Sequence, residues 1–176
     1  ELVEDSPHSV VFGGSRYPVV DGIPYLRIGR ENLIQTSLHY LDEGDHRGAL
    51  LLLLQDRDDW ASGAGPDKAA LAELVDGSLN LRQAMASVLE LGCGIGHYLR
   101  EFAARGIQAI GADVVFSKLW LARKYLVPGA RLVCFDAASR FPFANGAMGS
   151  VFCHDAFYFL PKKAHVAAEM RRVVGA

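Results

Sequence analysis

Cysteine is scarce in this sequence, and its few copies are not spaced as pairs. The 176 residues include three cysteines, Cys93, Cys134 and Cys153, with no CxxC pair among them. This spacing excludes a disulfide framework and a zinc ribbon as the basis of the fold. We therefore predict no metal site and a reducing, cytoplasmic location.

A strong positive charge is lacking too, as is a long apolar run. Lys and Arg number 18 against 20 Asp and Glu, which gives a formal net charge of −2. Proteins that hold a phosphate backbone concentrate basic side chains, so no nucleic-acid partner is expected. The longest purely apolar run, Ala49–Leu54, is far too short to span a bilayer, and no membrane partner is expected either. The acidic beginning, ELVEDSPHS, is unlike a signal peptide.

Residues 1–30 are expected to form an N-terminal β-hairpin segment. Apolar and aromatic residues flank Gly13-Gly14 and Asp21-Gly22, and both dipeptides favour tight turns. A lone hairpin is only marginally stable in water. We therefore expect this segment to pack against the rest of the chain.

Residues 31–85 are expected to form a helical lid or cap. Apolar residues recur at helical spacing from Ile34 onwards, and Asp45 is placed to cap a second helix that runs through Leu54. The leucines of that helix are expected to be buried on most sides. A third helix is predicted over 66–77, with proline at its start and glycine at its end.

From residue 86 to the last residue, 176, strands and helices alternate. The predicted strands are Ser87–Leu91, Ile107–Ala112, Arg131–Phe135 and Ser150–His154, and the predicted helices are Gly96–Arg105, Ser117–Leu126 and Pro161–Val174. Such alternation is typical of a parallel sheet whose two faces are covered by helices. The fold class is therefore α/β.

A strand that runs through a glycine-rich turn into a helix marks the strongest candidate site. The segment 88–96 reads VLELGCGIG, and glycines let a ligand approach the backbone at the start of a helix. Dinucleotide enzymes favour G-x-G-x-x-G, whereas His97 stands where that last glycine would fall. Glu90 at the strand end would face a cationic group more favourably than a diphosphate. The ligand is therefore expected to differ from NAD.

Two further acidic residues end the next two predicted strands at equal intervals. Asp113 follows the second strand and Asp136 follows the third. Because the carboxyl ends of parallel strands open on one edge of a sheet, these carboxylates and Glu90 should line one crevice. A carboxylate in the place of Asp113 can accept two ribose hydroxyls. One in the place of Asp136 can accept an exocyclic amine, while the N–H of Ala137 donates to the ring.

With these motifs, residues 87–174 resemble the class I S-adenosylmethionine-dependent methyltransferases, close to their small-molecule, type 11-like branch. The segments 141–160 and 169–173 resemble that branch's fourth-strand region and the helix after it. The resemblance implies a Rossmann-like fold over 86–176 and S-adenosyl-L-methionine as cofactor, with S-adenosyl-L-homocysteine as product. The cofactor-binding residues that it implies are Glu90, Gly92, Cys93, Gly94, Gly96, Asp113, Val114, Asp136, Ala137, Cys153 and His154.

The implied reaction is an in-line displacement of methyl from a cationic sulfur to a small organic acceptor, which depends mainly on positioning in a dry site. His154 is the first candidate for a general base because its place borders the methyl group and imidazole titrates near neutrality. Tyr158 and His97 are weaker candidates. The alternatives are a packed, non-catalytic His154 and a Tyr158 that lines the mouth of the crevice.

Two departures from the family leave other functions open. Gly149 stands where the family commonly has an aspartate, and the sequence ends where the resemblance implies a fifth strand still to come, so we expect the family's C-terminal strands to be missing from it. The fourth strand would then be a bare sheet edge, which we expect further chain, a homo-oligomer or another partner to cover. A non-catalytic interaction domain is therefore the alternative, and a nucleic-acid methyltransferase ranks last. Residues 17–24 also resemble the end of small zinc-ribbon-like modules, without their cysteines.

Overall fold

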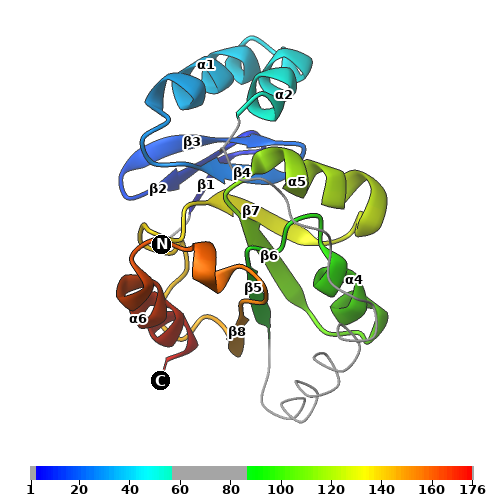
Figure 1. Ribbon diagram of the computed structural model, residues 1–176. Helices are drawn as coiled ribbons and strands as arrows, with labels where there is room; N and C mark the ends of the chain where they lie inside the picture. The colour runs from blue at the N-terminus through cyan, green and yellow to red at the C-terminus, as the bar shows by residue number, and fades with distance from the viewer. Residues whose placement is uncertain (1–2, 57–86, 176) are drawn as a thin grey trace.

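One mixed sheet runs through the part of the chain that the structure describes. The computed structural model describes residues 3–56 and 87–175, and Figure 1 shows their arrangement. The sheet order is β1-β2-β3-β4-β7-β6-β5-β8. The strands are β1 (Val3–Ser6), β2 (Ser9–Phe12), β3 (Ser15–Val20), β4 (Ile23–Leu26), β5 (Val88–Leu91), β6 (Ala109–Asp113), β7 (Arg131–Phe135) and β8 (Ser150–Phe152).

Helices cover the sheet on both faces, as the alternation predicts. Figure 1 shows α4 and α5 to one side of β5 and β6, and α6 to the other. The helices are α1 (Glu31–Asp42), α2 (His46–Leu54), α4 (His97–Ala104), α5 (Phe116–Leu121), which continues into a π-helical turn (Ala122–Leu126), and α6 (Lys163–Val174), with a 3-10 turn η3 (Phe157–Phe159). The predicted α/β architecture is confirmed.

The N-terminal segment is part of the main sheet. Strands β1 to β4 form an antiparallel meander, with the predicted turns at Gly13-Gly14 and Asp21-Gly22 between consecutive strands. Strand β4 then pairs in parallel with β7, so that Leu26 lies opposite Phe135. The packing partner that the hairpins require is therefore the edge of the parallel sheet itself.

Helices α1 and α2 follow the meander and pack on β3, and α2 also contacts α5. The predicted cap is present, because the Asp45 side chain accepts a hydrogen bond from the Gly48 N–H at 2.8 Å. The prediction that the leucines of α2 are buried on most sides is wrong at Leu51, which is 43% exposed, because the sheet and α1 cover only one side of this short helix. The helix predicted over 66–77 lies outside the described residues.

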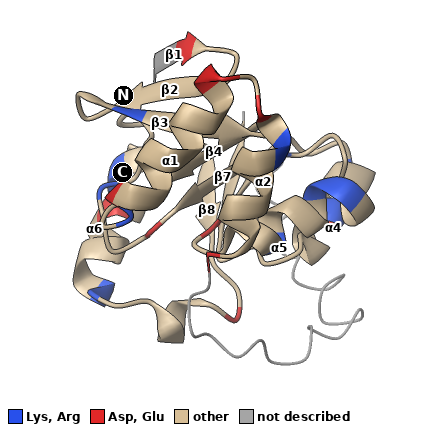
Figure 2. Cartoon of the chain, turned by 90° about the horizontal axis from the view of Figure 1, so that it is seen from above, with Lys and Arg blue, Asp and Glu red and all other residues tan. Residues whose placement is uncertain are grey.

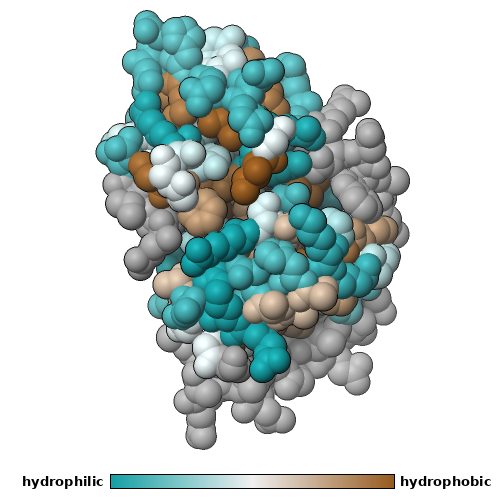
Figure 3. Space-filling model, turned by 90° about the vertical axis from the view of Figure 1, so that its left-hand side faces the viewer, coloured by the Kyte–Doolittle hydropathy of each residue, from teal (hydrophilic) through white to brown (hydrophobic). Residues whose placement is uncertain are grey.

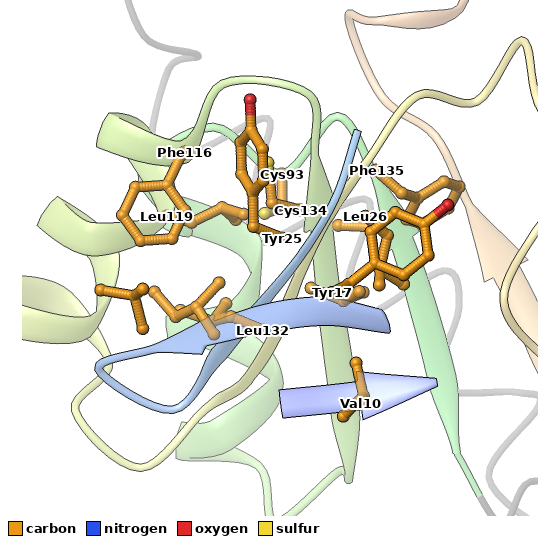
Figure 4. Close-up of a cluster of buried hydrophobic side chains, with 14 of the residues drawn as sticks. Val10, Tyr17, Tyr25, Leu26, Cys93, Phe116, Leu119, Leu132, Cys134 and Phe135 are labelled. Carbon is orange, nitrogen blue, oxygen red and sulfur yellow. The ribbon is translucent and has the colours of Figure 1, made fainter. Parts of the chain in front are cut away.

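The hydrophobic core is shared between the N-terminal strands and the parallel sheet. Tyr25 of β4 is fully buried, and its ring meets the edge of Phe116 from α5 at 6.0 Å between centroids. In Figure 4, Tyr25 lies between Leu119 and Cys134 on one side of β4, whereas Leu26 lies on the other side. Removing a buried aromatic ring of this kind costs about 3–5 kcal/mol. Strand β4 is therefore an integral part of the core.

The parallel strands bring their carboxyl ends to one edge. Leu91 of β5 lies opposite Ala112 of β6, and Asp113 lies opposite Cys134 of β7. Strand β8 pairs with β5 at the end of the described sheet. The prediction that this strand reaches His154 is wrong, because pairing with β5 stops at Phe152. Cys153, expected inside a buried strand, lies just beyond the strand and is half-buried.

The described surface mixes charges and apolar areas. Figure 2 shows lysine and arginine on several elements with acidic residues between them. The face in Figure 3 is largely hydrophilic, with hydrophobic residues across its upper half. Among the helices of residues 3–56 and 87–175, none has the length and apolar character that crossing a membrane requires.

Candidate functional site

The glycine-rich turn leads from β5 directly into α4, as predicted. Gly92, Gly94 and Gly96 have φ values of +70°, +56° and +85°, a region that favours glycine. Gly96 is the N-cap of α4, so the first backbone N–H groups of the helix face the turn. Such N–H groups attract an anionic ligand group.

Asp113 closes this turn from the neighbouring strand. Its Oδ2 accepts a hydrogen bond from the Gly94 N–H at 2.9 Å, and its Oδ1 accepts one from the Val115 N–H at 2.9 Å. The side chain is buried, and burial raises its pKa although these N–H groups act in the opposite direction. Each carboxylate oxygen has a second lone pair, so Asp113 can still accept hydrogen bonds from a ligand.

Glu90 is the most unusual group at this edge. It is 2% exposed, and its Oε2 has no hydrogen-bond partner among the described residues. Burial raises its pKa well above 4.5, the negative charge of Asp113 raises it further, and a backbone hydrogen bond from Leu99 opposes the rise. A buried carboxylate of this kind is costly unless a cation or donor satisfies it.

Among the residues that the structure describes, the groups that couple electrostatically to Glu90 leave the need for a cation unmet. They are Asp113, Cys93, Tyr98 and Cys153, which carry a negative charge or none. Burial raises the pKa of the Cys93 and Cys153 thiols, which keeps them neutral. A ligand with a cationic amino group would supply the missing partner of Glu90 Oε2.

The residues predicted to bind adenine lie along the same edge, at the end of β7, which is the strand beyond β6 as counted from Glu90 on β5. Asp136 follows directly after β7, and its Oδ1 accepts a hydrogen bond from the Ala138 N–H at 2.8 Å. Ala137 is buried beside it. Val114, between Asp113 and Val115, belongs to the neighbouring loop at the end of β6. Strand order therefore places the predicted ribose and adenine residues side by side.

The residues predicted near the reacting methyl group follow β8. His154 lies with its Nε2 3.4 Å from Asp155 Oδ2, and its ring meets the edge of Tyr98 at 5.0 Å between centroids. Tyr158 lies on η3 and is 62% exposed. His97 is half-buried in the first turn of α4. His154 therefore lies against the helix that begins at the glycine turn, whereas the Tyr158 ring is open to solvent.

Sequence reasoning missed two buried residues that border this edge. Tyr98 is 4% exposed and its hydroxyl has no hydrogen-bond partner among the described residues. Burial, together with the charges of Asp155 and Glu90, raises its pKa to about 12. Arg27 follows β4 and donates a hydrogen bond to the Val114 carbonyl. The aromatic residue after His97 gives a local signal for a core position only. Arg27 can be placed only when the pairing of β4 with β7 is known.

Two features of this edge fit the methionine part of S-adenosylmethionine. The amino group of the cofactor's methionine part would meet the unpartnered Glu90 Oε2, and the N–H groups at the start of α4 would meet its carboxylate. In the described part of the chain, no three His, Cys, Asp or Glu side chains gather as a metal site.

Comparison with known proteins points to the same cofactor family. Residues 89–175 match the methyltransferase domain family. The chain is 32% identical over 123 residues to a malonyl-[acyl-carrier protein] O-methyltransferase of Legionella pneumophila, which covers 66% of this chain and 42% of that protein. It is 28% identical over 113 residues to the biotin biosynthesis bifunctional protein BioHC of Cellvibrio japonicus, covering 64% of this chain and 22% of that protein. The chain thus matches less than half the length of these relatives.

A solved structure supports the fold. A TehB-like SAM-dependent methyltransferase from Corynebacterium glutamicum matches with a TM-score of 0.51 and 19% identity, over 81% of this chain and 68% of that one. The order β7-β6-β5-β8, the glycine turn and the acidic strand ends agree with the family match over 89–175. Residues 89–175 thus form a methyltransferase domain of the class I, S-adenosylmethionine-dependent family.

Proposed function

We propose that the protein transfers a methyl group from S-adenosylmethionine to a small organic acceptor. The observation that carries the proposal is Glu90, a buried carboxylate with an unpartnered oxygen beside a helix-leading glycine turn. When bound, the cofactor supplies an electrophilic methyl group on a cationic sulfur. The chain then has to bind, orient and exclude water, which is how such a displacement is accelerated.

Each element at the edge has a proposed part in binding. Glu90 receives the amino group, and Gly92, Cys93, Gly94 and Gly96 pass close to the methionine part through their backbone. Asp113 accepts from the ribose hydroxyls while it keeps its bonds to the turn. Val114, Asp136 and Ala137 hold the adenine, and Cys153 and His154 border the methyl group.

His154 is the proposed general base for acceptors that must lose a proton. Its Nε2 lies 3.4 Å from Asp155 Oδ2, which supports the tautomer that carries a proton on Nε2. Nδ1 would then be the nitrogen free to receive the acceptor's proton. Tyr158 is the second candidate, and its exposed hydroxyl would have to approach the acceptor from η3.

The acceptor class is argued from the aromatic residues that follow β8. Phe157, Tyr158 and Phe159 are 36%, 62% and 46% exposed, and exposed aromatic side chains gathered on one short turn favour a ligand with an apolar part. A curated relative is named a malonyl-[acyl-carrier protein] O-methyltransferase. A carboxylate carried on an aliphatic chain is therefore the first acceptor to test.

The first half of the chain is proposed to form a hairpin segment and a lid beside the cofactor domain. Residues 1–30, 31–85 and 86–176 remain the proposed hairpin segment, lid and cofactor domain, although β4 joins the cofactor domain's sheet. Within the proposed lid, α1 and α2 pack on β3. Residues 57–85 of that lid lie outside the described part. A partner or a second copy that covers β8, the last strand of the described sheet, also remains a proposal.

Calorimetric titration with S-adenosylhomocysteine tests the proposal directly. We expect the wild-type protein to bind, and Asp113→Ala to bind at least about tenfold more weakly, because hydrogen bonds to a charged acceptor contribute about 1.5–3 kcal/mol. The same change also leaves the Gly94 and Val115 N–H groups without their partner. The titration should therefore be made well below the unfolding temperature of the variant.

Asp45→Ala is the matched control, because it removes another aspartate that accepts from a backbone N–H but caps the distant helix α2. It should lower stability by about 1 kcal/mol and leave S-adenosylhomocysteine affinity unchanged. A wild-type protein that does not bind would favour the non-catalytic interaction domain. Equal binding by wild type and Asp113→Ala would remove the ribose assignment alone.

A further inference from the structure

A buried polar cluster joins the N-terminal half of the chain to the edge where the cofactor is proposed to bind. Arg27 follows β4 and is 6% exposed. Its Nη1 donates a hydrogen bond to the carbonyl oxygen of Val114 at 2.5 Å and lies 3.5 Å from Asp56 Oδ2. Asp56 also accepts a hydrogen bond from the Tyr25 hydroxyl at 2.5 Å. Its other oxygen lies 3.2 Å from Arg30 Nε.

The pairing of β4 with β7 brings Arg27 to the loop that follows β6. Leu26 lies opposite Phe135, so the next residue of each strand, Arg27 and Asp136, stands at the carboxyl edge of the sheet. Asp56 comes from the chain just after α2 and supplies the negative charge that a buried guanidinium needs. The cluster therefore depends on β4 and on the residues that follow α2.

The contact to Val114 fixes one particular peptide group. The Val114 carbonyl and the Val115 N–H belong to the same planar peptide. The N–H donates to Asp113 Oδ1 at 2.9 Å, and the carbonyl accepts from Arg27. Arg27 and Asp113 thus hold the two ends of one peptide plane, and a rotation of that plane would break both bonds.

We propose that Arg27 is a positioning residue for the cofactor site, which holds the peptide between Val114 and Val115 so that Asp113 keeps the orientation needed for the ribose. The inference rests on the proposed function. It makes Arg27 part of the cofactor site although this residue lies outside the matched methyltransferase domain of 89–175. Arg27 acts through Asp113 and through the loop, without touching the reacting atoms.

The experiment compares S-adenosylhomocysteine binding by wild type, Arg27→Met and Tyr25→Phe of the full chain. We expect Arg27→Met to bind about tenfold more weakly, because the carbonyl of the peptide that orients Asp113 loses its charged donor and keeps only the weak Cys134 Sγ donor at 3.5 Å. Tyr25→Phe is the matched control, because it removes a hydrogen bond to Asp56 from the same cluster and keeps the contact of Arg27 with Val114. Its affinity should stay within about twofold of wild type.

A double-mutant cycle separates positioning from a general effect on structure. Because Arg27 acts through Asp113, Arg27→Met should weaken binding no further in an Asp113→Ala background, so the double variant stays near the single Asp113→Ala value. Losses that multiply, to about a hundredfold in total, would overturn the inference. Unchanged binding by a folded Arg27→Met would overturn it as well.

Arg27→Lys serves if the methionine variant does not fold. It keeps a cation for Asp56, but its shorter side chain lacks the guanidinium that reaches Val114, so a loss of about threefold is expected. Wild-type affinity in this variant would overturn the inference. A wild-type protein that binds no S-adenosylhomocysteine would overturn both this inference and the proposed function, whereas each result above overturns the role of Arg27 alone.

Discussion

Replacing Gly92 with alanine should lower the free energy of unfolding by about 3 kcal/mol, because two separate costs add at this position. Gly92 has a φ of +70°, which L side chains rarely adopt. A Cβ atom placed on it would lie 2.3 Å from the Cβ of Ala156, in the loop after β8. The turn and that loop would therefore have to separate, and urea-induced unfolding of the ligand-free protein measures the loss.

Two variants separate these costs. Gly106→Ala is the matched control, because Gly106 has a φ of +68° and nothing within 4 Å of the added Cβ, so it should lose only about 1 kcal/mol. Ala156→Gly in the Gly92→Ala background removes the colliding atom and should restore most of the difference between the two single variants. Equal losses in Gly92→Ala and Gly106→Ala would show that the turn and the loop after β8 are not in tight contact.

This contact also bears on function, since it joins the two sides of the site. Ala156 follows His154 and Asp155, and Gly92 follows β5. A separation of the two segments would move His154 away from the residues that bind the methionine part. Gly92→Ala should therefore abolish measurable S-adenosylhomocysteine binding, an effect that Gly106→Ala should not share because Gly106 lies at the far end of α4.

The parallel part of the fold was predictable because its signals are local. Strand β7 has the predicted bounds, Arg131–Phe135, and its apolar run is typical of a strand buried on both faces. The glycine turn between β5 and α4 was predictable because its backbone needs residues that tolerate positive φ. The positions of Glu90 and Asp113 followed from the rule that parallel strands end on one edge.

The pairing of β4 with β7 was not predictable in the same way. Both turns of the meander have sequence signals, but nothing local tells that residues near 25 lie beside residues near 134. Arg27 was missed for this reason, since an arginine after a strand is usually exposed. The place of Asp113 in the sequence predicted that its carboxylate lies at the sheet edge. It did not indicate that both carboxylate oxygens already accept hydrogen bonds from backbone N–H groups.

Replacing Glu90 with glutamine should make the ligand-free protein more stable and its binding of S-adenosylhomocysteine about a hundredfold weaker. Above about pH 4.5 stability rises because folding forces the buried Glu90 to keep a proton that the unfolded chain releases, whereas glutamine is neutral in both states. Binding weakens because the cationic amino group loses its partner, and removing one member of a buried charge pair costs about 2–5 kcal/mol. Calorimetry and thermal unfolding measure the two effects on the same samples.

The stability of the wild-type protein should also depend on pH through this residue. The folded-state pKa of Glu90 is raised well above its ordinary value of 4.5, so the folded protein keeps a proton that the unfolded chain releases. Stability should therefore fall as pH rises from about 4.5 through the folded-state pKa, by at most about 1.4 kcal/mol per pH unit from this group. Glu90→Gln should remove that part of the slope and leave the smaller part due to Asp113, whose pKa is also raised.

The affinity for the ligand should depend on pH in the opposite direction to the stability of the ligand-free protein. A cationic amino group placed beside Glu90 favours its ionised form, so S-adenosylhomocysteine should bind more tightly as pH rises toward the raised pKa and should release protons as it binds. Titrations in buffers of different ionisation enthalpy detect that release, which Glu90→Gln should abolish. Glu101→Gln is the control, because this carboxylate lies on α4 beside Arg105 with a lowered pKa and should change neither quantity. A Glu90→Gln protein that binds as tightly as wild type and releases the same protons would mean that the amino group lies elsewhere.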